Sequence, residues 1–104
     1  MERPFIIIDG RRVEPAPPKM KVWRAFLEHT ERDFSKESLD DFLKAQGGLI
    51  VTGFGKPDIV NEDSIDENLE IAEVVPLTRK LFSWLQLVTF ERLAAAPNAL
   101  EGKD

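Results

Sequence analysis

Few residues in this sequence are suited to chemistry, and the single histidine, His29, is the first to consider. A catalytic relay or a metal triad needs further histidine, cysteine or carboxylate groups held around such a residue. The chain contains no cysteine and no second histidine. We expect His29 to lie at the C-terminal end of a helix, where a positive charge is mildly stabilised. A catalytic role is therefore not predicted for it.

The Gly-Phe-Gly-Lys segment at 53–56 has some features of a loop that binds nucleotide phosphates. The expected six-residue spacing of the glycines is absent, and so is the helix that should follow. Pro57 occupies the position of the Ser or Thr hydroxyl that would bind the metal of a nucleotide. A helix C-cap explains both glycines better, so no cofactor site is predicted.

A third candidate is an acidic stretch between residues 58 and 67. Its ligand spacing differs from that of a calcium loop, and the obligatory central glycine is missing. We expect a solvated loop leading into a helix, where acidic side chains favour the positive end of the helix dipole. The functional alternative is an acidic patch for a basic partner. The residues concerned are Asp58, Asn61, Glu62, Asp63, Asp66 and Glu67.

No catalytic, cofactor-binding or metal-binding residue survives these comparisons, so we expect a protein that is not an enzyme. With 104 residues, the chain has room for one domain with one core. Its net charge of -5 argues against nucleic-acid binding, which needs clustered Lys and Arg. Its apolar runs are too short to span a membrane. The absence of cysteine suits a reducing compartment, and we expect a cytoplasmic location.

The elements that must carry any function begin with a short hairpin. Residues 5–8 are aromatic and β-branched, which favours a strand. Asp9-Gly10 is a strong turn sequence, and residues 11–13 can form the return strand. Three prolines then end the pairing and make a stiff link.

Three helical stretches follow, at about 18–30, at 38–54 and from residue 71 to Pro97. Ser38 is predicted to cap the second helix, and Gly47-Gly48 interrupts the apolar stripe of that helix. We expect that helix to continue to Phe54, although a short strand at 49–52 is an alternative. We expect an acidic loop at 58–68 with one short turn of helix at 64–68. The predicted fold is α+β and predominantly helical, with an N-terminal β-hairpin followed by about three main helices. We expect residues 1–98 to form a single globular domain and 99–104 to form a flexible C-terminal tail.

The last helix is apolar over an unusually wide arc. Its predicted core stripe consists of Ile71, Val74, Val75, Thr78, Phe82, Leu85 and Thr89, and it is widened by Leu77, Leu81, Trp84, Leu87 and Val88. These side chains cannot all face one interior, so either the helix is central or part of it meets another subunit. The residues predicted as candidates for partner contact are Trp23, Trp84, Leu87 and Phe90.

The order of these segments resembles the tail assembly chaperones of long-tailed phages and prophages, especially those of Gram-positive hosts. The resemblance extends from about Pro4 to Asn98. It rests first on the Phe5–Gly10 strand and turn, and on the Pro-rich segment that leads into a helix with Met20, Trp23 and Arg24. The Leu39–Gly55 helix, which ends in Phe-Gly-Lys, comes next. The acidic Asn61–Asn68 segment and the aromatic helix from Glu73 through Trp84 complete the resemblance. Gly47-Gly48 departs from the family pattern, because that helix is usually less broken.

This resemblance implies a chaperone that binds the tape measure protein and helps recruit the major tail (tube) protein, without being retained in the finished particle. Self-association is also compatible with the wide apolar arc of the last helix. The sequence is also compatible with two other classes of protein. One is a small structural phage protein of the head–tail connector or tail completion type. The other is a regulatory protein-interaction module.

Overall fold

The N-terminus of the protein folds as a β-hairpin, as the sequence predicts. The computed structural model describes residues 3–95, the last four of these by backbone alone. Strand β1 (Ile6–Ile8) pairs antiparallel with β2 (Arg11–Val13), with Ile6 opposite Val13. Asp9 and Gly10 both have positive φ, 51° and 81°, as a tight two-residue turn between twisted strands requires.

Helix α1 (Met20–Thr30) follows a proline-containing link that is anchored to the second helix. The amide of Ala16 donates a hydrogen bond of 2.9 Å to the carbonyl of Phe54. The helix begins at Met20, two residues later than predicted, because Lys19 keeps an extended backbone (φ -106°, ψ 170°). Val22 and Phe26 form its buried face.

Helix α2 (Leu39–Phe54) runs without interruption through Gly47-Gly48, so the alternative of a strand at 49–52 is wrong. The predicted cap is confirmed, because the Ser38 hydroxyl accepts a hydrogen bond of 3.1 Å from the amide of Asp41. Gly55 ends the helix with a left-handed φ of 64°, a conformation that favours glycine. The prediction of a C-cap is therefore confirmed for Gly55, but it is wrong for Gly53, which lies inside α2 and is buried against Leu81 and Phe26.

The acidic segment forms a fourth helix, α3 (Glu62–Asn68), which is longer than the single turn predicted at 64–68. Asn61 and Ser64 make a reciprocal capping box at its start, with each side chain accepting from the other's backbone amide at 2.9 Å. Such a box stabilises a short helix despite its polar composition. Helix α4 (Ile71–Ala95) then completes the fold, with Pro76 inside it.

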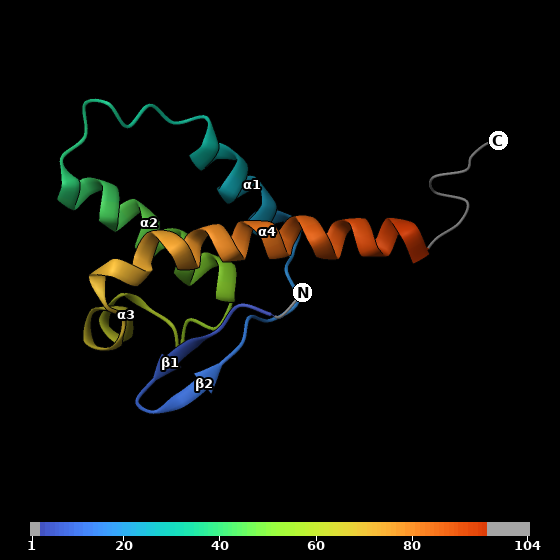
Figure 1. Ribbon diagram of the computed structural model, residues 1–104, viewed down its shortest axis with the longest axis horizontal. Helices are drawn as coiled ribbons and strands as arrows, with labels where there is room; N and C mark the ends of the chain where they lie inside the picture. Colours follow the sequence, from blue (N-terminus) through green and yellow to red (C-terminus); the bar gives the residue numbers. More distant parts are fainter. Residues whose placement is uncertain (1–2, 96–104) are drawn as a thin grey trace.

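Figure 1 shows α4 running along the length of the molecule, with α1 on one side of it, the hairpin on the other and α2 crossing it. Both sides of α4 therefore bury apolar residues, and α2 packs closely against it. The predicted core stripe is wrong at its two ends: Ile71 is 78% exposed and Thr89 is exposed. The inward residues of α4 are instead Val74, Leu77, Thr78, Leu81, Trp84 and Leu85.

The fold is α+β and predominantly helical, as predicted, with one hairpin and four helices in the described range. One cluster of buried side chains joins the hairpin to all four helices. Its largest fully buried members are Phe26, Ile50, Phe54, Val60 and Leu81. The predicted tail at 99–104 lies outside the described residues.

Candidate protein-binding surfaces

The residues first considered for chemistry occupy structural positions. His29 lies in the last turn of α1, as predicted. Gly53 is buried within α2, and the acidic stretch supplies the first turn of α3. Between residues 3 and 95, no group of three or more His, Asp or Glu side chains is placed to hold a metal ion.

His29 lies beside α2, in contact with an aromatic ring and a polar side chain. Its ring lies 4.7 Å from the ring of Phe34, measured between centroids. Its Nε2 lies 2.7 Å from Nε2 of Gln46, a residue that is only 4% exposed. A neutral histidine with its proton on Nδ1 can accept a hydrogen bond from this amide, whereas a protonated one cannot. With the Gln46 amide nitrogen toward the ring, this contact is compatible with neutral His29.

Burial lowers the pKa of His29 below its ordinary value of 6.5, and the Arg32 guanidinium lowers it further, while Glu37 partly opposes them. The unfolded chain therefore takes up this proton at a higher pH than the folded chain does. We expect the melting temperature to fall as pH decreases from about 7.5 to about 5.5, because protonation below 6.5 favours the unfolded state. Circular dichroism melts across this window measure the effect.

The control for this prediction is His29→Gln, which cannot titrate and should show a smaller decrease between the two pH values. Equal decreases in both proteins would contradict it. Titration of Asp33 does not contribute to the change in melting temperature between these two pH values. A hydrogen bond from the Ser35 amide lowers the pKa of its carboxyl below 3.8, so its stabilisation is lost only at more acidic pH.

The structure separates the two tryptophans predicted to contact a partner. Trp23 is half-buried on α1, and its ring stacks on Phe82 of α4 with a centroid distance of 5.9 Å. Trp84 is only 5% exposed and belongs to the core. Its prediction as a contact residue is therefore corrected: it lies one turn after the fully buried Leu81, on the inward face of α4.

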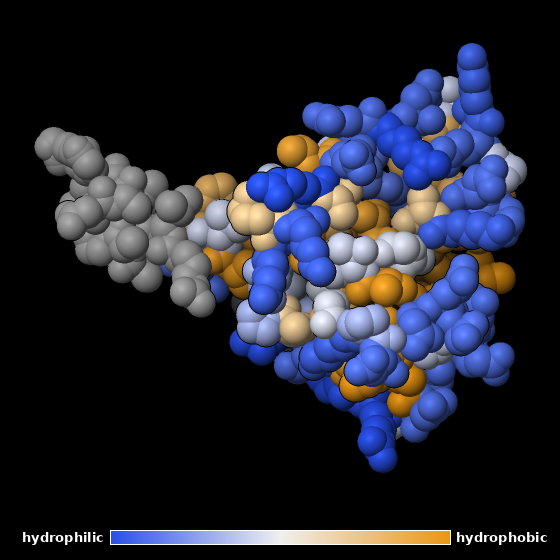
Figure 2. Space-filling model, turned by 180° about the vertical axis from the view of Figure 1, so that it is seen from behind, coloured by the Kyte–Doolittle hydropathy of each residue, from blue (hydrophilic) through white to orange (hydrophobic). Residues whose placement is uncertain are grey.

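The other two candidates lie on the last turns of α4, which extend beyond the rest of the fold (Figure 1). Leu87 is half-buried, and Phe90 is 65% exposed. Of the four predicted residues, Phe90 thus presents the most surface. Figure 2 shows further apolar surface scattered among hydrophilic side chains on one face of the molecule. The large exposed apolar residues are Phe5, Ile7, Met20, Leu27, Leu39, Ile59, Ile71 and Phe90.

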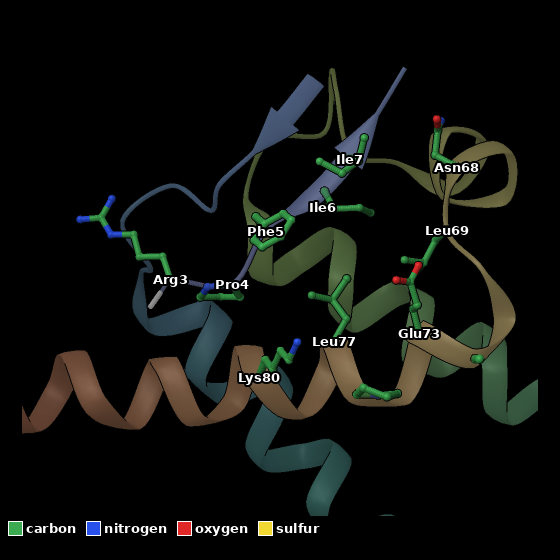
Figure 3. A pocket seen from close by; sticks show the side chains of 12 residues that line it. Arg3, Pro4, Phe5, Ile6, Ile7, Asn68, Leu69, Glu73, Leu77 and Lys80 are labelled. Atoms are coloured by element: carbon green, nitrogen blue, oxygen red, sulfur yellow. The ribbon is translucent and has the colours of Figure 1, made fainter. Parts of the chain in front are cut away.

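An apolar hollow of about 430 Å³ lies between β1 and the first half of α4 (Figure 3). We call it the strand groove. Its charged lining residues include Glu73 and Lys80, both on α4. Its apolar lining consists mainly of Phe5, Ile6, Ile7, Leu69, Pro76 and Leu77.

The strand groove follows from the alternation of side chains along β1. Ile6 and Ile8 point inward, with 3% and 7% of their surface exposed. Phe5 and Ile7 therefore point outward, and they remain 38% and 45% exposed. At the end of the strand, the Asn68 side-chain oxygen accepts a hydrogen bond of 2.9 Å from the amide of Asp9. This bond connects the end of α3 to the hairpin and fixes one end of the groove.

The strand groove also offers backbone groups that the fold leaves without regular partners. The sheet of the described residues has two strands, so one edge of β1 carries no strand partner. Pro76 has no amide hydrogen, so the Ala72 carbonyl receives no helical bond from the position four residues later. Both residues line the groove. Apolar side chains beside the backbone of an edge strand suit a protein ligand better than a small metabolite.

Reasoning from the sequence missed this groove. Phe5 and Ile7 were included in the strand but not among the contact candidates, although alternation alone places one face of the hairpin outward. The sequence does not indicate that Leu69 and Pro76 line the same groove, because their positions beside β1 depend on how α3 and α4 pack relative to the hairpin.

Comparison with known proteins finds no matching protein-family model, no matching curated protein and no matching solved structure. In the part of the chain that the structure describes, no helix combines the length and apolar composition needed to cross a membrane. Function is therefore inferred from the surfaces and from the resemblance in sequence.

Proposed function

We propose that this chain is a non-enzymatic tail assembly chaperone of a long-tailed phage or prophage. It would bind the tape measure protein and help recruit tail tube subunits in the cytoplasm of the bacterial host. The observation that carries the proposal is the strand groove, where Phe5 and Ile7 remain exposed beside an edge of β1 that pairs with no other strand of the described residues.

The physical requirement of such a chaperone fits this surface. A tape measure protein is a long helical chain that exposes apolar stripes until the tail tube encloses it. A reversible cover needs exposed apolar area, but not so much that the chaperone itself aggregates. A shallow groove with charged residues such as Glu73 and Lys80 meets both needs. Weak contacts repeated along a long client would give avidity without permanent attachment.

The order of the elements supports the same proposal. The hairpin, the proline-containing link, the two helices α1 and α2, the acidic α3 and the aromatic α4 follow each other as the resemblance implies. Gly47-Gly48 was the one departure from the family pattern, and α2 is nevertheless continuous there.

The proposal is tested by co-expression with the tape measure protein encoded in the same genome. We expect that protein to be soluble only when this chain is present. Ile7→Lys should reduce the soluble client by about tenfold, because a lysine ammonium group in the groove must be desolvated when the client binds. Quantitative blotting of the supernatant after centrifugation measures the effect.

The matched control is Ile59→Lys, because Ile59 is 46% exposed against 45% for Ile7, and it lies outside the strand groove. This variant should retain the wild-type yield of soluble client. A tape measure protein that is equally soluble with and without this chain would overturn the proposed function. Equal losses with both lysine variants would show that the strand groove is not the client site.

A further inference from the structure

A second apolar groove lies on another part of the surface, between α2 on one side and α3 with the start of α4 on the other. Its volume is about 590 Å³, and we call it the glycine groove. Leu43 and Val51 line it from α2, and Ile65 lines it from α3. Ile71, which is 78% exposed, stands at the start of α4. This surface has no part in the proposal above.

Gly47 and Gly48 leave the helix backbone bare along this groove. A Cβ atom built on either residue would meet no other atom within 4 Å. Neither residue has a positive φ, so the backbone of α2 does not require glycine there. Glycine is a poor helix former, and packing among the described residues does not explain two in succession. Their effect is to let another backbone approach α2 closely.

The charges around the glycine groove are predominantly acidic. Asp40, Lys44, Glu62 and Asp66 line it, giving three carboxylates and one ammonium group. Lys44 is engaged by Asp40, with 3.4 Å between Nζ and the carboxylate oxygen. Within residues 3–95, neither Glu62 nor Asp66 makes a salt bridge, so their charges are open to a ligand. The groove therefore complements a basic partner.

The shape of the glycine groove selects a helix rather than an extended chain. Both of its walls are helical faces, and mid-helix amides and carbonyls are already hydrogen-bonded, so they cannot pair with a strand. From Asp40 to Val51 the groove follows α2 for about 16 Å, or about three helical turns. Apolar side chains spaced three and four residues apart on a partner helix would fit between these walls.

We infer that the glycine groove binds one amphipathic helix of a partner protein, about three turns long, with an apolar seam and Lys or Arg on its flanks. This site is distinct from the strand groove, and the inference does not depend on a role in tail assembly. The bare backbone at Gly47-Gly48 receives the seam, and Glu62 and Asp66 face the basic flank.

The probe is a fluorescent amphipathic peptide of about 14 residues, with leucine along its seam and lysine on both flanks. Fluorescence anisotropy should show binding to the full-length protein, and a peptide with glutamate in place of each lysine should bind at least about tenfold more weakly. Methyl NMR should show the largest shifts at Leu43, Val51, Ile65 and Ile71. Shifts confined to other surfaces, or equal binding of both peptides, would overturn the inference.

Charge reversal gives a matched pair of variants. E62K/D66K reverses two groove carboxylates and should weaken the lysine peptide by at least about tenfold. D63K/E67K makes the same change of net charge on exposed positions of α3 that do not line the groove. That control should bind as wild type does at the same ionic strength. Equal losses in the two variants would show nonspecific charge attraction and overturn the inference.

Gly47→Leu tests the close approach independently of charge. We expect it to abolish measurable peptide binding while raising the melting temperature, since leucine favours a helix and the space at this position is open. Loss of folding therefore cannot explain the loss of binding. Undiminished binding by this variant would overturn the inference.

Sedimentation tests whether a second copy of this chain is the occupant instead. The outward face of α1 carries Met20, Lys21, Arg24 and Leu27, so it is itself basic and amphipathic. Concentration-dependent association that both K21E/R24E and E62K/D66K abolish would identify α1 of another copy as the ligand. That outcome would overturn the assignment to a partner protein.

Discussion

Phe54→Ala should cost about 3–5 kcal/mol of the free energy of unfolding, enough to leave little folded protein at physiological temperature. Phe54 is 0% exposed at the end of α2 and belongs to the one cluster of buried side chains. Its carbonyl also accepts the hydrogen bond from Ala16, so its position fixes the link that leads into α1. Truncation leaves a cavity at this junction. Urea unfolding followed by circular dichroism measures the loss.

The control for this prediction is Phe90→Ala, since Phe90 is 65% exposed on the projecting end of α4. Removing an exposed ring should change the free energy of unfolding by no more than about 0.5 kcal/mol. A destabilisation of similar size at both positions would show that the end of α4 packs against something in solution, and the distinction drawn between core and surface would be wrong.

Gly53→Leu should destabilise the fold by about 1–3 kcal/mol, because this glycine lies where α1, α2 and α4 meet. A Cβ atom there would lie 3.2 Å from Cδ1 of Leu81 and 3.4 Å from the ring of Phe26. Both neighbours are buried almost completely, so neither can move away without disturbing the core. The larger leucine side chain would add atoms beyond a Cβ that is already in tight contact.

Gly48→Ala should have the opposite effect and stabilise the protein by about 0.5–1 kcal/mol, since helix propensity improves and the space is open. The two substitutions are compared by the same urea unfolding experiment. Destabilisation by Gly48→Ala, or tolerance of Gly53→Leu, would contradict the packing of α2 described above.

Much of the local structure could be predicted from the sequence because its causes lie within a few residues. The turn at Asp9-Gly10 requires positive φ, which these residue types tolerate. The cap at Ser38 and the left-handed end at Gly55 each depend on one side chain, or its absence, next to a helix terminus. Helix α3 was underestimated, although the Asn61–Ser64 box that stabilises it is also local and could have been recognised.

The candidate surfaces were predicted less well, and α4 shows why. A helix that is apolar over a wide arc has no single inward direction, so periodicity alone could not separate Trp84 in the core from Phe90 at the surface. Only the way the other helices and the hairpin pack around α4 decides this. The sequence likewise does not distinguish Gly47-Gly48, which lie beside open space, from Gly53, which lies in close contact with other helices.

The sequence by itself therefore determined the hairpin, the three longer helices, the cap at Ser38, the end at Gly55 and the scarcity of residues for chemistry. Tertiary structure alone decided which apolar side chains remain outside. The strand groove and the glycine groove each bring together residues from segments far apart in the chain, such as Phe5 with Leu77 and Leu43 with Ile65. Such contacts depend on the packing of whole elements against one another, whereas caps and turns depend on the conformations of adjacent residues.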